Sequence, residues 1–180
     1  MNSRSIPADW LPQYNYADYA KWEGNWELIY GFPYAMSPSP KRAHQVAERK
    51  FMRLVEDALE SEKLNCDCAV FHELDWIIND TTVVRPDVMI VCGDFKDDFL
   101  HFPPVLIVEI TSESTRMNDR NVKFKLYESQ GVKYYIMVDP ERTLIEVFNL
   151  KDNLYQEFNS IRFQLTSSCS VELNLEKICK

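Results

Sequence analysis

Three charged residues lie in or beside apolar runs of this sequence. Asp87 opens one run after Pro86, and Glu109 lies inside another that spans residues 105–110. Both runs are short, rich in β-branched residues and bounded by turn residues, which predicts buried strands. A buried carboxylate is costly unless a positive group holds it, so two of them in neighbouring strands predict a shared cation. Lys123, on the helix expected to follow, is a candidate third member.

This set of residues could hydrolyse a phosphodiester bond. Mg²⁺ prefers hard oxygen ligands, usually one or two carboxylates plus waters. Adjacent strands lie ~4.8 Å apart, so one carboxylate from each strand can reach one ion. A bound ion makes water more acidic and polarises the phosphoryl oxygen, while a nearby lysine orients the water or stabilises charge. We therefore expect Mg²⁺ or Mn²⁺ to be held by Asp87, Glu109 and the carbonyl oxygen of Ile110.

Each of these residues also has an ordinary structural explanation, which the residues alone leave open. Asp87 could cap a turn before its strand. Glu109 could form a structural salt bridge with Lys123 or Lys125. Lys123 could instead be a solvated helix residue that pairs with Asp119.

Length and composition indicate one globular domain. With 180 residues and an apolar fraction of 46%, the chain can bury a real core, and we expect an arm over residues 1–24 and a single domain over 25–180. The net charge of −8 opposes non-specific attraction to nucleic acid, although a local basic groove would still allow binding. The four glycines of the chain form neither a G-x-G-x-x-G pattern nor a P-loop, which excludes the classical nucleotide-binding loops. No apolar stretch reaches the length of a membrane span.

The cysteines predict a reduced, cytoplasmic protein. They stand at positions 66, 68, 92, 169 and 179, an odd number, and no signal peptide precedes them. The pair Cys66 and Cys68 has no second pair at zinc-finger spacing, so we interpret both as small residues of a strand.

Several elements are expected to position the charged residues. Residues 26–36 predict two strands around a turn at Gly31, and Glu27 in the first is most simply a solvated charge of an edge strand. A helix is predicted from Ser39-Pro40 to about residue 63. His44 and Glu48 share one face of it, either as a surface pair or as support for the carboxylates.

Two further elements complete the expected site. Residues 66–78 alternate loosely and predict one strand. A second helix is predicted from Asp119 to Gln130, ended by Gly131 in a left-handed conformation. Residues four apart share a helix face, so this helix presents three side chains together: Asp119, Lys123 and Tyr127.

Taken in order, these motifs resemble the Uma2 (DUF820) family of the PD-(D/E)XK nuclease-like superfamily. The resemblance extends from Glu27 to about residue 175 and rests on Pro86-Asp87, Glu109-Ile110-Thr111-Ser112, Asp119 with Lys123 and Tyr127, Gly131-Val132, Tyr135 and Val138-Asp139. It implies an α/β (α+β) fold of the restriction-endonuclease type, in which a mixed β-sheet is flanked by helices.

The resemblance also implies roles for single residues. Asp87 matches the metal-binding aspartate, Glu109 the second acid, and Glu27 an early acid that binds metal or water. The lysine that usually follows the second acid by two residues is replaced here by Thr111. Lys123 stands where the Uma2 pattern carries a lysine on the next helix.

Supporting roles around this site are implied for His44, Thr111, Asp119 and Tyr127. The sequence departs from the family pattern at Tyr134 and Ile136, where Glu and Trp are common. Neither position carries the expected chemistry, so the departure concerns contacts with partners.

Two functions follow as hypotheses. The first is a Mg²⁺-dependent endonuclease that cleaves DNA phosphodiester bonds, although the sequence does not distinguish DNA from RNA. The second is a catalytically inactive nuclease-like module that binds nucleic acid or protein, which the acidic balance favours. Its aromatic residues Trp10, Tyr14, Trp22 and Trp76 would then form a surface for self-association. The resemblance implies a homodimer in either case.

Overall fold

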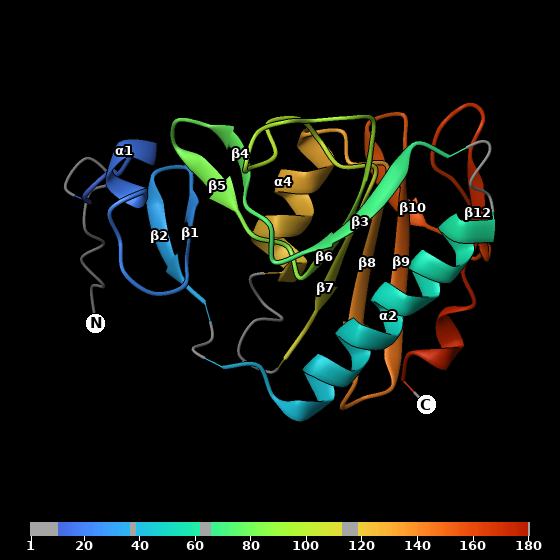
Figure 1. The fold of residues 1–180 in the computed structure, drawn as a ribbon. Helices are drawn as coiled ribbons and strands as arrows, with labels where there is room; N and C mark the ends of the chain where they lie inside the picture. The colour runs from blue at the N-terminus through green and yellow to red at the C-terminus, as the bar shows by residue number, and fades with distance from the viewer. Residues whose placement is uncertain (1–10, 37–38, 62–65, 113–118, 180) are drawn as a thin grey trace.

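A six-stranded mixed sheet forms the centre of the computed structural model, which describes residues 11–36, 39–61, 66–112 and 119–179 (Figure 1). In sheet order its strands are β10 (Leu154–Glu157), β9 (Leu144–Lys151), β8 (Tyr134–Asp139), β7 (Leu106–Ile110), β6 (Val88–Cys92) and β3 (Cys68–His72). Strands β7 and β8 are parallel, and the other neighbouring pairs are antiparallel. The predicted mixed sheet is therefore confirmed.

Helices cover both faces of this sheet (Figure 1). Helix α2 (Arg42–Ser61) packs on one face, and the short helix α4 (Phe124–Ser129) packs on the other. Successive side chains of a strand point to opposite faces. Ile107 belongs to the core on the α4 side, so Glu109, two residues further along β7, also points toward that helix.

A second, four-stranded sheet lies beside the first. Its antiparallel strands, in order, are β2 (Phe32–Ala35), β1 (Trp26–Ile29), β5 (Thr82–Val84) and β4 (Trp76–Asn79). The two predicted strands around Gly31 are confirmed, and this glycine has a φ of 81°. The short helix α1 (Tyr16–Tyr19) follows Tyr14, whose N–H donates to the carbonyl of Gly31 at 2.9 Å.

Two predictions about element boundaries are wrong. Residues 66–78 form two strands, β3 and β4, which belong to different sheets, because the chain turns at Glu73 with a φ of 47°. The long helix begins at Arg42 instead of Pro40, and its predicted end near residue 63 lies outside the described residues.

The helix that carries Lys123 begins with a wide turn. Residues Asp119–Lys123 form a π-helical turn, and α4 continues from Phe124. It ends as predicted, because Gly131 has a φ of 80° and the N–H of Val132 donates to the carbonyl of Tyr127 at 3.1 Å. This Schellman-type end fixes the last turn and with it the position of the Tyr127 side chain.

The prediction of reduced cysteines is wrong. Disulfides join Cys66 to Cys169 and Cys68 to Cys92, and Cys179 is the free thiol. Cys68 and Cys92 are direct partners in the β3–β6 ladder. The other disulfide joins the segment just before β3 to the connection between β11 (Arg162–Gln164) and β12 (Ser170–Glu172), which form the C-terminal hairpin. The cytoplasmic location loses this support and stays a prediction.

Candidate active site

Asp87 and Glu109 lie side by side at the end of two antiparallel strands. Val88 pairs with Val108, so one further step along the same register places the two acids opposite each other. The backbone N–H of Ile110 donates to Oδ2 of Asp87 at 2.6 Å. Both acids line one cavity of about 420 Å³, together with Lys123. The structure therefore brings together the three residues with which the sequence analysis began.

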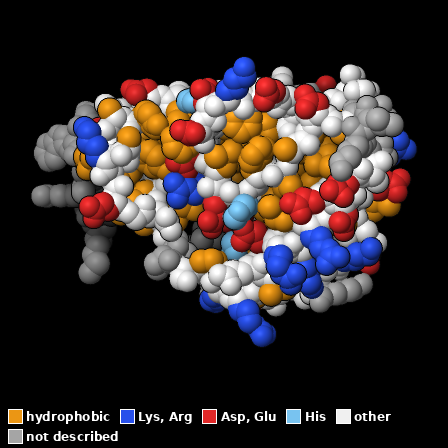
Figure 2. Space-filling view, viewed as in Figure 1, with side chains coloured by type: hydrophobic (Ala, Val, Ile, Leu, Met, Phe, Trp, Pro, Cys, Tyr) orange, Lys and Arg blue, Asp and Glu red, His pale blue; other side chains and the backbone are white. Residues whose placement is uncertain are grey.

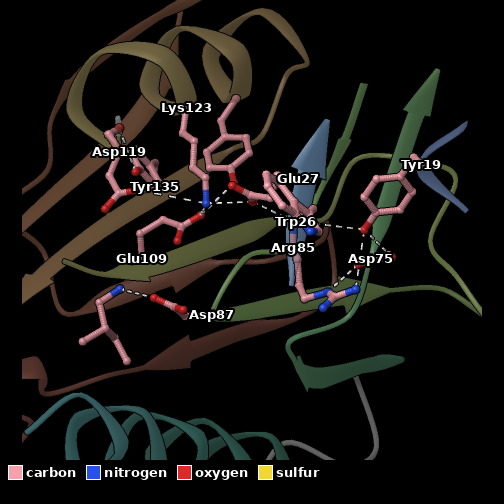
Figure 3. A network of polar contacts seen from close by, with 12 residues as sticks. Tyr19, Trp26, Glu27, Asp75, Arg85, Asp87, Glu109, Asp119, Lys123 and Tyr135 are labelled. Atoms are coloured by element: carbon pink, nitrogen blue, oxygen red, sulfur yellow. Dashed lines mark hydrogen bonds and ion pairs between the residues drawn. The ribbon is translucent and has the colours of Figure 1, made fainter. Parts of the chain in front are cut away.

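Lys123 is the centre of a buried charge cluster (Figure 3). Its Nζ lies 2.8 Å from Oε1 of Glu27, 3.0 Å from Oε1 of Glu109 and 4.0 Å from Oδ1 of Asp119. All four residues are at most 4% exposed. The alternatives of a solvated lysine and a solvated edge charge are thus wrong, since β1, which carries Glu27, is an inner strand of its sheet.

Tyr127 holds Glu109 from the same helix. Its hydroxyl donates to Oε1 of Glu109 at 2.7 Å, and its ring stacks on Trp76 at a centroid distance of 6.1 Å. The two hydrogen bonds that Glu109 receives from described side chains both end on Oε1. Trp76 is 1% exposed, so it takes no part in a surface for self-association.

The cluster holds more carboxyl groups than cations, because three acids surround the one lysine. Burial raises the pKa of Glu109 well above its usual value, and although Lys123 opposes this rise, the nearby acids add to it. Burial alone would lower the pKa of Lys123, but Glu109, Glu27 and Asp119 together raise it well above its usual value. Lys123 therefore stays protonated, while the carboxylates around it would be stabilised by a further positive charge.

Helix α2 supports Asp87 through His44. Its Nε2 lies 3.2 Å from Oδ2 of Asp87, and its Nδ1 lies 3.8 Å from Oε2 of Glu48. Nδ1 is buried and makes no hydrogen bond within the part of the chain that the structure describes. Burial alone would lower the pKa of His44, but Asp87, Glu48 and Glu73 raise it. Of the two alternatives for the face that carries His44 and Glu48, the structure places His44 in contact with Asp87.

Thr111 and Asp119 make backbone contacts next to the acids. The N–H of Thr111 donates to the carbonyl of Val138 at 2.7 Å, and its hydroxyl lies 3.5 Å from the same oxygen. Thr111 thus forms part of the cavity wall, and the hydrogen bonds that it donates within the described residues go to the backbone of Val138. The backbone carbonyl of Asp119 accepts from the hydroxyl of Tyr135 at 3.1 Å.

Sequence reasoning missed a second polar network that adjoins the first. Arg85 donates from its backbone N–H to Oε1 of Glu27 at 2.8 Å and from Nε to Oδ1 of Asp75 at 2.6 Å. The hydroxyl of Tyr19 donates to Oδ2 of Asp75 at 3.0 Å. The available signal was an arginine directly before Pro86-Asp87, at the entrance to the strand that carries the acid.

The donor set suits a hard divalent cation. Asp87 and Glu109 offer carboxylate oxygens from adjacent strands beside one cavity, and the excess of acids would be offset by such an ion. Within the described ranges, no three His, Cys, Asp or Glu side chains form a group that could hold a metal. An ion placed between Asp87 and Glu109 would need water to complete its ligands, an arrangement that Mg²⁺ commonly accepts.

The fold is that of a nuclease-like protein. A crystal structure from Anabaena variabilis ATCC 29413, described as "a putative nuclease belonging to DUF820", has a TM-score of 0.69, 14% identity, and coverage of 91% of this chain and 98% of that chain. The Uma2 family model, described as "Putative restriction endonuclease", matches residues 16–176. The chain belongs to the Uma2 family, which confirms the resemblance seen in the sequence.

The chain is also similar in sequence to a protein whose name states no activity. It is a Synechocystis protein named "Uncharacterized protein slr1290", 27% identical over 154 residues, which cover 82% of this chain and 80% of that protein. Among the described helices, none is long and apolar enough to cross a membrane.

Proposed function

We propose that this protein is a divalent-metal-dependent endonuclease that hydrolyses phosphodiester bonds of DNA. The observation that carries the proposal is the meeting of Asp87, Glu109 and Lys123 in one cavity, on three different segments of the chain. Membership of a family described as "Putative restriction endonuclease" supports the same class of reaction.

Asp87 and Glu109 would hold Mg²⁺ or Mn²⁺, with the carbonyl oxygen of Ile110 as a further ligand. When bound, this ion supplies charge stabilisation and a more acidic water. The chain orients both ligands through second contacts, as metal sites generally do. Asp87 is fixed by the N–H of Ile110 and by His44, and Glu109 is fixed by Tyr127.

Lys123 would stabilise the charge that develops on the phosphate. Its ammonium is held protonated by the surrounding acids and is 4% exposed, so it acts where water screens it little. Glu27 keeps this ammonium in place at 2.8 Å and, at the cavity wall, would orient an attacking water.

The test is cleavage of supercoiled plasmid DNA in Mg²⁺ or Mn²⁺ by the wild type and by Asp87→Asn, Glu109→Gln and Lys123→Met. We expect each variant to be slower by about 10²-fold or more. Asp57→Asn, on the exposed side of α2 with a side chain 71% exposed, is the control that should keep the wild-type rate. Wild-type rates in the Asp87 and Glu109 variants would overturn the mechanism. Cleavage of RNA but not of DNA in a parallel assay would contradict the assignment of DNA as the substrate.

The second candidate function is that of a catalytically inactive nuclease-like module that binds nucleic acid or protein. The net charge of −8 favours it, because phosphate-binding proteins normally carry a basic footprint. A homodimer would assemble through surfaces other than Trp76, which is buried. Tyr14 and Trp22 contact each other edge to face at 5.3 Å and remain half-buried, so they could serve such a surface. A stable dimer in sedimentation that takes up no divalent ion would favour this candidate.

A further inference from the structure

We propose that Arg85 binds a backbone phosphate of the nucleic acid beside the carboxylate site. This inference rests on the proposed function, since it names a contact with the same substrate. Arg85 lines the same cavity as Asp87 and Glu109, and its side chain is 25% exposed. In Figure 2 acidic, basic and histidine side chains gather on this face between the four-stranded sheet and helix α2.

The charge around the cavity favours a further cationic contact for the substrate. A nucleic acid strand is anionic, and the acids of the site would repel it. Lys123 is 5% exposed in its side chain and already contacts three carboxylates. Lys41 at the cavity rim is 69% exposed and pairs with Glu141 at 2.9 Å. The side chain of Arg85 is more exposed than that of Lys123 and less exposed than that of Lys41, and its hydrogen bonds hold it in a fixed place.

The guanidinium of Arg85 has donors left for a ligand. An arginine offers five N–H groups in a planar fork that matches two phosphate oxygens. The Nε–H of Arg85 is used by Asp75 at 2.6 Å. The two terminal nitrogens make long contacts, 3.4 Å to Oδ1 of Asn25 and 3.5 Å to the hydroxyl of Tyr19. A phosphate could thus replace two weak contacts without breaking the strong one.

The fork is also held in position from two sides (Figure 3). Asp75, 8% exposed in its side chain, receives hydrogen bonds from Arg85 and from Tyr19 of the N-terminal helix α1. The backbone N–H of Arg85 donates to Glu27, which in turn contacts Lys123. Arg85 and the charge cluster are therefore parts of one hydrogen-bonded framework, in which the pre-set fork loses little freedom on binding.

The experiment measures the affinity of a short DNA duplex at several salt concentrations, with Ca²⁺ in place of Mg²⁺ and with gel analysis to verify that the DNA stays intact. Losing one phosphate contact should reduce the slope of log K against log salt by about 0.9. We expect Arg85→Gln to show this reduction and to bind about tenfold more weakly. Arg85→Lys keeps the charge but loses the fork, so it should bind more weakly with the wild-type slope.

Two further variants make the result decisive. Arg53→Gln removes the same charge from α2, where the side chain is 76% exposed, and should bind as the wild type does. Arg85→Gln leaves the buried carboxylate of Asp75 without a positively charged partner. If this single variant fails to fold, the double variant Asp75→Asn/Arg85→Gln is measured in its place. An unchanged salt slope and affinity in the folded variant would overturn the inference.

The same measurements separate this inference from the proposed function. If the wild type cleaves DNA but Arg85→Gln binds unchanged, the phosphate contact is wrong and the nuclease proposal stands. If the wild type binds without cleaving and the slope still falls in Arg85→Gln, the contact stands and hydrolysis is wrong. If the wild type neither binds nor cleaves, both are overturned.

Discussion

The ammonium of Lys123 lies 3.0 Å from Oε1 of Glu109, although the two residues are 14 positions apart and belong to different elements. The acid comes from a central strand of the sheet, and the lysine comes from the π-helical turn that begins the helix packed on it. Such turns are frequent at functional sites. The positive side chain of the site, Lys123, therefore comes from the neighbouring helix, and Thr111 stands two residues after the acid on the strand side.

Replacing Lys123 with methionine should destabilise the protein by about 3–5 kcal/mol, because Glu27 and Glu109 would be left buried without a cation. Lys125→Met, two residues further along the helix and on another face, is the matched control. That side chain is 68% exposed and pairs with Glu128, so its loss should cost less than about 1 kcal/mol. Urea unfolding measures both, and equal losses in the two variants would contradict the role of Lys123 as the buried counter-charge.

The sequence allowed the central part of this site to be predicted because local periodicity determines it. Asp87 and Glu109 each belong to a short β-branched run, and a residue in such a run has only two faces to point to. The spacing of four between Lys123 and Tyr127 fixed them on one helix face. In the structure both of these side chains contact Glu109, as their shared face implied.

What could not be predicted depends on contacts between distant segments. Arg85 lies 66 residues from Tyr19 and 10 from Asp75, and no periodic pattern connects the three. The turn at Glu73 has a positive φ on a residue that rarely adopts it, so the strand break there left no sequence signal. Cysteine pairing likewise depends on which strands become neighbours.

The disulfides predict that protein purified without reductant contains one thiol, that of Cys179. The disulfide between Cys66 and Cys169 spans 103 residues, and its reduction should lower the free energy of unfolding by about 2–4 kcal/mol. Thiol titration in denaturant and urea unfolding with and without dithiothreitol check both statements. Five titrating thiols in the protein as purified would show that the bonds do not form.

Tyr155 predicts a loss of stability in alkali. Burial, with a smaller contribution from the charge of Glu128, raises the pKa of Tyr155 above its usual value, and its hydroxyl donates to the carbonyl of Val132 at 2.9 Å. Above about pH 10 the unfolded chain loses this proton while the folded protein keeps it, so the free energy of unfolding falls as pH rises. The fall from this group should reach about 1.4 kcal/mol per pH unit.

Tyr155→Phe should remove that contribution. It loses one hydrogen bond at every pH, worth about 1 kcal/mol, but its unfolding free energy should decline less steeply than that of the wild type above about pH 10. Urea unfolding at a series of alkaline pH values measures the two slopes. Parallel slopes would show that the phenol of Tyr155 titrates alike in the folded and unfolded chains.

The central claim is that Asp87 and Glu109 share one divalent cation, and calorimetric titration with Mn²⁺ tests it most directly. We predict that the wild type binds Mn²⁺ at a single site and that Asp87→Asn abolishes the binding, while Asp57→Asn, far out on an exposed helix face, retains it. Absence of Mn²⁺ binding by the wild type, or undiminished binding by Asp87→Asn, would contradict the account.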